Sequence, residues 1–234
     1  CQYISLKIQK EVWPVRTRSR NDEEKFLRRE AILDAAMEVF FSKGFEKASM
    51  DEIAKRAKLS RSLIYVYFKD KIDIHMGLCL RAGQALLRYQ EEGMAKCKTG
   101  IEKVYATGEA YYAFYREEPN LFKIMSMKLG MLEEMQPAPG QETPCQLEMQ
   151  KFEDQIMHQM VLAIESGLAD GTIDKAKVNS PLQTAMFMRG SLHGVILLQD
   201  STGSRLFDRV DLDREALINY SHNLVTATLA VEKE

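Results

Sequence analysis

Residues 49–74 read SMDEIAKRAKLSRSLIYVYFKDKIDI, and two short helices joined by a tight turn are predicted within them. Ser49 and Glu52 have the S-x-x-E spacing of a capping box, in which each side chain accepts a hydrogen bond from the other residue's backbone N–H. A helix should therefore begin here. The run ends at residues 58–60, where Ser60 is a favourable N-cap for a second helix.

Helices of seven or eight residues are marginal in water, so these two need a third helix to cover them. A suitable helix is predicted upstream over residues 22–43, and Gly44 follows it as a left-handed stop. Its apolar stripe would face the buried positions Ile64 and Phe68 of the second short helix. The stripe consists of Phe26, Ala31, Ile32, Leu33, Ala35, Ala36, Val39 and Phe40. This three-helix pattern is typical of a helix-turn-helix unit, a common DNA-binding element.

The segment LIYVYFKDK, residues 63–71, resembles the tetracycline-repressor (TetR) family of transcription regulators. It carries the family's Tyr-x-x-Phe-x-x-Lys signature as Tyr65, Phe68 and Lys71, at the family's usual place near the N-terminus. The family usually has glycine in the preceding turn, where this chain has Lys58. We therefore expect Lys58 to adopt a positive φ, which is uncommon for a residue with a side chain.

The resemblance implies that the second short helix enters the major groove of DNA, so that its outward side chains meet base edges while neighbouring residues contact phosphates. The expected base contacts are Arg61, Ser62, Leu63 and Val66. The expected phosphate contacts are Lys47, Ser49, Tyr65, Tyr67 and Lys71. Alternatives stay open for Tyr67, which can pack in the core, and for Lys71, which can be a solvated charge. Arg16, Arg18 and Arg20 form either a minor-groove arm or a solvated tail.

The chain has 234 residues, 45% of them hydrophobic, which suffices for a buried core. Its net charge of −2 conceals an asymmetry, because residues 1–75 carry 16 Lys and Arg against 12 Asp and Glu, leaving 16 against 22 for the remainder. A basic head on an acidic body fits a DNA-contacting end, although a difference of this size can also arise by chance.

No catalytic or cofactor-binding motif is found, so neither an enzyme nor a cofactor is predicted. The four cysteines lack metal-ligand or disulfide spacing and are interpreted as reduced thiols, with a redox role for one of them open. The four histidines fall on separate predicted helices, and only His158 and His193 are considered as a pair that could meet in space. No segment reaches the roughly 18 apolar residues that a membrane span needs.

The whole chain is predicted to be all-α, with about nine helices. Residues 1–20 are interpreted as an extension, either flexible or foreign to the natural chain, because the chain begins at Cys1 and residues 2–15 are irregular. Residues 21–70 form the expected DNA-binding domain and residues 71–234 the expected ligand-binding and dimerisation domain. Helices in this second domain are predicted over residues 70–95, 101–117, 119–128, 145–168, 181–199 and 211–231, with a loop at 136–144 and turns at 170–173 and 201–204.

Aromatic residues and methionines concentrate in the second domain. Six of the 20 aromatic residues lie within residues 105–122, and nine of the 13 methionines lie between residues 125 and 188. Methionine adapts to irregular apolar sites, and tyrosine adds a hydrogen-bonding tip. These residues predict a pocket for an apolar or aromatic small molecule, and ordinary core packing is the alternative for each. The candidate lining is Tyr105, Tyr112, Tyr115, Met125, Phe152, Met157, Met160, Met186 and His193.

The last two predicted helices carry apolar residues on more than one face, which indicates burial against both the body and a partner. The resemblance implies a homodimer joined through these helices. The expected interface residues are Met186, Leu192, Val195, Ile196, Leu217, Tyr220, Leu224 and Ala227. An intramolecular core accounts for part of the same pattern.

The resemblance implies a cytoplasmic, nucleoid-associated repressor that binds a palindromic operator as a homodimer and is released by a small-molecule inducer. Two alternatives remain: the same fold acting as a protein-interaction module, and a regulator that responds to no ligand. The basic residues Arg61, Lys69 and Lys71 favour DNA over a protein partner.

Overall fold

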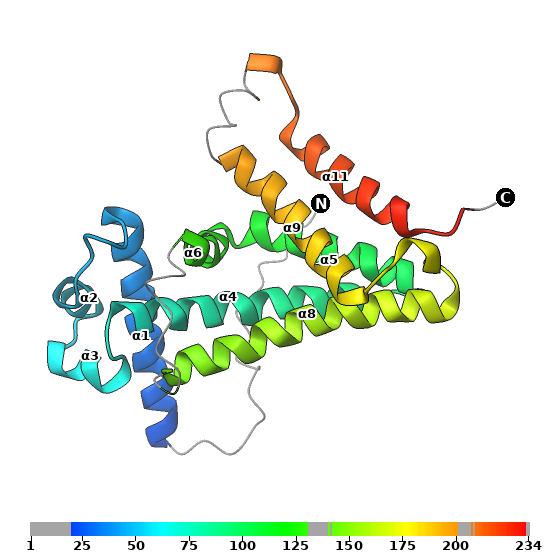
Figure 1. Ribbon diagram of the computed structural model, residues 1–234. Helices are drawn as coiled ribbons and strands as arrows, with labels where there is room; N and C mark the ends of the chain where they lie inside the picture. Colours follow the sequence, from blue (N-terminus) through cyan, green and yellow to red (C-terminus); the bar gives the residue numbers. More distant parts are fainter. Residues whose placement is uncertain (1–19, 131–139, 141, 201–206, 208, 233–234) are drawn as a thin grey trace. The chain divides into compact units, whose positions relative to one another are not determined.

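The computed structural model describes residues 20–130, 140, 142–200, 207 and 209–232 (Figure 1). Over these residues the chain forms nine α-helices and one short 3₁₀-helix, with no strand, so the predicted all-α class is confirmed. The helices are α1 (Arg20–Lys43), α2 (Met50–Ala57), α3 (Arg61–Tyr67), α4 (Lys71–Met94), α5 (Gly100–Glu117), α6 (Pro119–Gly130), α8 (Pro144–Asp170), α9 (Pro181–Asp200) and α11 (Arg214–Leu229), and the 3₁₀-helix is η1 (Lys175–Lys177).

Some predictions concern segments that the structure leaves undescribed. These are the extension before residue 20 with its arm residues Arg16 and Arg18, the side chain of Arg20, the turn at residues 201–204, and most of the loop at residues 136–144. They lie outside the described residues.

The observed boundaries of the helices lie close to the predicted ones, apart from the start of the last helix. α11 begins at Arg214 rather than at residue 211, because the Asp213 carboxylate accepts hydrogen bonds from the N–H groups of Glu215 and Ala216. An N-cap residue fixes the first turn in this way. No sequence pattern predicted η1, which follows the cap residue Asp174.

The described residues divide into two compact units, one ending at Lys71 and the other beginning at Ile72. In the first unit α1 packs against α2, and α2 packs against α3. Their contact is apolar, with Ile32, Phe40, Ile53 and Ile64 buried. The rings of Phe40 and Phe45 lie 5.1 Å apart, which packs the segment between α1 and α2 onto α1. The predicted stripe of α1 is buried from Ile32 onward, whereas Ala31 is exposed.

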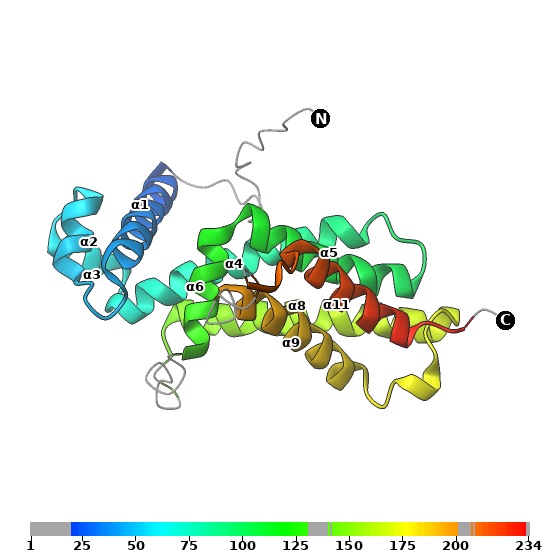
Figure 2. The ribbon, with the colours of Figure 1, turned by 90° about the horizontal axis from the view of Figure 1, so that it is seen from above.

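In the second unit α5 and α8 lie side by side, and α9 and α11 pair with each other and rest on them (Figures 1 and 2). Gly100 and Gly167 let α5 approach α8 closely, because a Cβ on Gly100 would lie 1.9 Å from the backbone nitrogen of Gly167. The core between these four helices is a cluster of apolar side chains. Its buried members are Val104, Met160, Ala163, Ile164, Ile173, Ala185, Met188 and Leu229.

The end of α11 is tied to the segment that connects α8 and α9. Ile173 and Ala230 form an isolated antiparallel bridge, and the backbone N–H of Asp174 donates to the carbonyl of Leu229. These bonds, together with the pairing of α9 and α11, fix α11 over α5.

Candidate nucleic-acid interface and ligand cavity

The two short helices are held by the caps that the sequence predicts. The Ser49 hydroxyl accepts from the N–H of Glu52, and the Glu52 carboxylate accepts from the N–H of Ser49, which completes the capping box. Lys43 pairs with the same carboxylate from the end of α1. Ser60 caps α3 by accepting from the N–H of Leu63. The start of each helix is therefore set by local hydrogen bonds.

The turn between α2 and α3 contains the predicted left-handed residue. Lys58 has φ 56° and ψ 38°, and its N–H bonds back to carbonyls of the last turn of α2. The expectation for Lys58 is confirmed. A side chain in this region carries a steric cost of about 1 kcal/mol or more, which glycine would avoid.

α3 turns one face inward and another outward. Ile64 is fully buried and Leu63 is half-buried, whereas Val66 is 75% exposed and Tyr65 is 45% exposed. Arg61 and Ser62 at the start of the helix are also exposed. Three of the four predicted base-contacting side chains thus lie in solvent on a short, firmly capped helix, and Leu63 lies at the edge of that face.

Arg61 is held in place by two neighbours. Its guanidinium pairs with the Asp51 carboxylate of α2 at 3.1 Å, and it lies 5.7 Å from the centre of the Tyr65 ring. The hydrogen bond to the Tyr65 hydroxyl and, after it, the charge of the Asp51 carboxylate raise the pKa of Arg61. A charged, oriented guanidinium offers two parallel donors, the arrangement that recognises guanine O6 and N7.

Lys71, a predicted phosphate contact, is engaged within the first unit. Its ammonium group donates to the carbonyls of Phe45 and Glu46 at 3.1 and 3.0 Å and lies 4.8 Å from the Phe45 ring centre. The structure thus gives Lys71 a role that neither sequence interpretation included. It fastens the segment between α1 and α2 to the start of α4.

The other predicted phosphate contacts differ in their surroundings. Lys47 and Ser49 are exposed beside the start of α2, where backbone N–H groups favour an anion. The Ser49 hydroxyl is already used in the capping box. Tyr65 is exposed, and Tyr67 is half-buried, between the two interpretations that the sequence left open.

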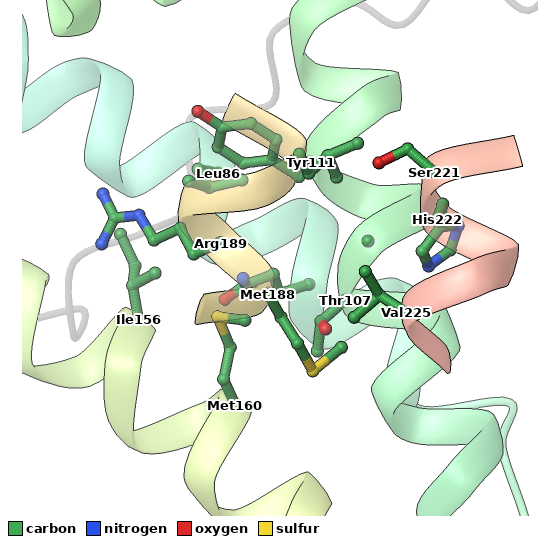
Figure 3. A pocket seen from close by; sticks show the side chains of 13 residues that line it. Leu86, Thr107, Tyr111, Ile156, Met160, Met188, Arg189, Ser221, His222 and Val225 are labelled. Carbon is green, nitrogen blue, oxygen red and sulfur yellow. The ribbon is translucent and has the colours of Figure 1, made fainter. Parts of the chain in front are cut away.

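The second unit contains a cavity of about 20 Å³, bounded by α4, α5, α8, α9 and α11 (Figure 3). Space of this size admits roughly one water molecule. Figure 3 shows His222 and Val225 reaching in from α11, Met160 from α8 and Met188 from α9. The complete lining is Leu86, Gln90, Thr107, Gly108, Tyr111, Ile156, Met160, Met188, Arg189, Leu192, Ser221, His222 and Val225.

Of the nine residues predicted to line a pocket, Met160 alone lines this cavity. Met186 is 61% exposed on α9 because that side of the helix faces away from α8, and Tyr105 is exposed on α5. Met125 is buried elsewhere, and Tyr112, Tyr115, Phe152, Met157 and His193 are half-buried outside the lining. Composition pointed to the unit that contains this cavity, but it did not indicate which side chains of the helices face inward.

Tyr111, Gln90 and His222 line the cavity, although none of them was predicted to do so. A usable signal existed for His222, which stands four residues after Ile218 and four before Thr226 on the buried stripe of α11. That four-residue spacing marks one face of a helix. No comparable signal singled out Gln90, whose burial depends on how the helices pack.

Several polar groups at the cavity are buried. His222 donates through Nδ1 to the Glu109 carboxylate at 3.1 Å and stacks on Tyr105. Burial lowers the pKa of His222, and Glu109 and the Tyr105 backbone oppose this shift only in part. Burial also raises the pKa of Tyr111, whose hydroxyl bonds to His193. Both groups are therefore neutral near pH 7.

α9 and α11 expose apolar side chains over much of their length. Met186, Tyr220 and Leu224, all predicted interface residues, are 61%, 64% and 53% exposed. Ala227 is exposed, while Val195 and Leu217 are half-buried. Leu192 and Ile196 are buried in the body instead, because they lie on the inner face of α9. Phe187, which was not among the predicted interface residues, is 66% exposed on the outer face.

Within the described residues, no group of three or more His, Cys, Asp and Glu side chains is placed to hold a metal ion. None of the helices described here combines the length and apolar character needed to cross a bilayer.

Residues 32–74 match the model of a family described as bacterial regulatory proteins, tetR family. The chain is 28% identical over 98 residues to the HTH-type transcriptional activator FasR of Mycolicibacterium smegmatis, covering 42% of this chain and 45% of FasR. It is 29% identical over 98 residues to the fatty acid metabolism regulator protein of Bacillus subtilis, covering 42% of this chain and 50% of that protein. The match thus spans about half the length of these relatives.

The structure resembles the transcriptional regulator FadR from Bacillus subtilis, solved in complex with stearoyl-CoA, with a TM-score of 0.63. The two chains are 20% identical, and the similarity covers 86% of this chain and 98% of FadR. At this identity the likeness shows a common fold, which includes both units of the chain.

Proposed function

This chain belongs to the TetR family of bacterial regulatory proteins, and we propose that it is a transcriptional regulator that binds a palindromic operator as a homodimer. A small molecule bound in the body would release it from DNA, so that its resting action is repression. The known relatives are regulators of transcription rather than enzymes. A protein that works on the bacterial chromosome acts in the cytoplasm, at the nucleoid.

The outward face of α3 is the observation that carries the proposal. Arg61, Ser62 and Val66 are exposed on a helix whose start and preceding turn are fixed by caps. A major groove admits one helix, and side chains at its N-terminal end reach the base edges. Lys47 and the first turn of α2 supply groups suited to a phosphate nearby.

A homodimer is supported by the exposed apolar faces of α9 and α11. Soluble monomers seldom leave large contiguous apolar patches in water, and such patches often mark interfaces. Phe187, Met186 and Leu224 lie on these faces, and two copies of the helix pair would cover them in a four-helix contact. A symmetric dimer would place two α3 helices on two half-sites of a palindrome.

Release from DNA by a bound ligand is supported by the position of the cavity, which lies among the helices that join the core to the proposed interface. A ligand that binds one arrangement of α4, α9 and α11 more tightly shifts the population toward it. A large shift requires a preference of several kcal/mol. FadR of Bacillus subtilis was solved in complex with stearoyl-CoA, whose acyl chain is apolar, and this supports a ligand with an apolar part.

Selection of bound sequences from a random DNA pool tests the proposal directly. We expect an enriched palindrome whose half-sites lie about one helical turn apart, bound with an affinity that falls steeply as salt increases. Absence of any salt-dependent enrichment by the full chain would contradict the regulator function. A reporter gene placed behind the enriched site then separates repression from the activation named for FasR.

A further inference from the structure

Two hydrogen-bond acceptors line the body cavity without a partner, and we propose that the cavity binds an uncharged apolar molecule carrying a hydroxyl group. The acceptors are His222 Nε2 and Gln90 Oε1, and the ligand class is an aliphatic alcohol or a phenol. The inference rests on the proposed ligand switch and specifies its chemistry.

His222 Nε2 is an acceptor because of what Nδ1 does. A carboxylate can only accept a hydrogen bond, so the bond between His222 Nδ1 and Glu109 Oε1 requires the proton on Nδ1. A neutral imidazole with its proton on Nδ1 presents a bare lone pair at Nε2. This atom is buried and has no hydrogen-bond partner.

A missing side chain on α5 makes room for that lone pair. A Cβ on Gly108 would lie 2.2 Å from His222 Nε2, and Gly108 lines the same cavity. The ring can therefore stand close to α5, with its unbonded nitrogen beside Gly108 in the cavity wall. Figure 3 shows His222 on α11 beside Val225, which also lines the cavity.

Gln90 contributes the second acceptor from α4. Gln90 is only 2% exposed, and its Oε1 has no hydrogen-bond partner. A buried polar atom without a hydrogen bond is costly in free energy. A ligand hydroxyl can donate a hydrogen bond to one of these acceptors, and it can also accept one from the Thr107 or Ser221 hydroxyl, which line the same cavity. Two such atoms at one cavity favour a ligand that supplies a donor.

The charges at the cavity favour an uncharged ligand. No acidic residue is among the lining residues, and Arg189 is, so an ammonium group would be desolvated without a counter-ion. The two lone pairs likewise disfavour a carboxylate, and Figure 3 shows the Arg189 guanidinium turned away from His222. A fatty acyl ester fits poorly because its polar end carries only acceptors.

The cavity must widen to admit such a molecule. Its present volume suits one water, which is the competing occupant for the two acceptors. Met160 and Met188 form part of the wall, and methionine side chains change rotamer at little cost. The apolar tail of the ligand would occupy the space that these two side chains vacate.

Calorimetric titration of the full chain with three eight-carbon probes tests the inference. The probes are 1-octanol, octyl methyl ether and octanoate. We expect 1-octanol to bind about tenfold more tightly than the ether, since the ether leaves both acceptors unpaired. Equal or tighter binding of the ether or of octanoate would overturn the assignment. A lone structural water would give no heat with any probe, which overturns it as well.

Matched variants locate the effect. Gln90→Leu and His222→Phe should bring the ratio of alcohol to ether affinity close to one, while His222→Gln, which restores an acceptor, should keep it high. His158→Phe makes the same change at an exposed histidine of α8 and should leave the ratio unchanged. An unaltered ratio in both Gln90→Leu and His222→Phe refutes the proposal. Operator binding is measured separately, so a result that contradicts the proposed ligand class does not by itself contradict the DNA-binding function.

Discussion

Arg61 is the residue from which we expect base discrimination. Arg61→Ala removes the guanidinium that Asp51 and Tyr65 orient, and preference at one position of each half-site should relax by about 1–3 kcal/mol. Asp51→Asn keeps the guanidinium but releases it, so a smaller loss at the same position is expected. Competition binding with operators substituted at each position measures both effects.

Lys71 provides the comparison for Arg61. Lys71→Ala removes a proposed phosphate contact, so it should weaken binding to all operators about equally and lower the salt slope of binding by about one. Because Lys71 also bonds to the carbonyls of Phe45 and Glu46, the variant should melt at a lower temperature than Arg61→Ala. If both variants shifted every sequence equally, the separation between base and phosphate roles would be wrong.

The left-handed Lys58 is an avoidable source of strain. Lys58→Gly should raise the free energy of unfolding of the first unit by up to about 1 kcal/mol, because glycine adopts φ 56° without a Cβ clash. Lys58→Ala removes the charge but keeps the Cβ, so it serves as the control and should bring no such gain. Urea titration of all three proteins measures the difference. An equal gain in both variants would point to the charge of Lys58 instead.

His222 should make stability depend on pH. Its pKa in the unfolded chain is the ordinary 6.5, and burial lowers the pKa in the folded chain. As pH falls through 6.5 the unfolded state binds more protons than the folded state, so stability decreases until the pH reaches the folded pKa. His222→Gln should flatten this decrease in thermal melts between pH 7.5 and 5.5.

The pKa of His193 is lowered by burial too, so His222→Gln should remove the pH dependence only in part. His158→Gln, at an exposed position of α8, is the matched control and should melt with the pH dependence of the original chain. A pH dependence that His222→Gln leaves unchanged would show that other groups cause it.

At the scale of elements, the crossing of α5 and α8 depends on two glycines. A Cβ on Gly100 would lie 1.9 Å from the backbone of Gly167, and backbone atoms cannot move aside as a flexible side chain can. Gly100→Ala should therefore destabilise the chain by about 2 kcal/mol or more, the range of overpacking in a close contact. Gly83→Ala is the control, because its Cβ would meet Phe152 at an ordinary 3.6 Å. A Gly100→Ala variant as stable as Gly83→Ala would contradict the close crossing.

The helices could be predicted from sequence because their ends are decided locally. Ser49 with Glu52, Ser60 and Gly44 each act through hydrogen bonds or a backbone conformation within a few residues. The cavity could not be predicted in this way. Its lining depends on which side of each helix faces the core, and the abundant Met and Tyr residues lie on several sides. Met186, in the predicted lining, is among the more exposed apolar residues.

The register of α9 explains why Met186, predicted to line the pocket, and Leu192 and Ile196, predicted at the interface, lie on opposite faces of the helix. Leu192 and Ile196 are buried in the chain's own core, whereas Met186 and Phe187 lie in solvent. A helix with apolar residues nearly all round gives no periodic signal to separate these two faces. The sequence therefore indicated that α9 contacts both the body of its own chain and a second copy, but it did not indicate which residues face each of them.

For the whole molecule, the proposed dimer determines whether two short α3 helices bind an operator tightly. One α3 makes few contacts, and linking two through a rigid dimer makes the second contact intramolecular, which raises the overall affinity by orders of magnitude. Loss of the dimer should thus weaken specific binding far more than loss of a single contact to a base.

Phe187→Asp tests this dependence by placing a charge on the outer face of α9. Phe187 is 66% exposed, so the folded monomer should tolerate the change, whereas a buried interface should not accept an unpaired carboxylate. We expect sedimentation to report a monomer and operator affinity to fall at least a hundredfold. The melting temperature of the variant should not depend on protein concentration, as befits a monomer. Leu147→Asp, at a 46% exposed position of α8, should remain dimeric and bind the operator normally. A Phe187→Asp protein that stays dimeric would move the interface away from this face of α9.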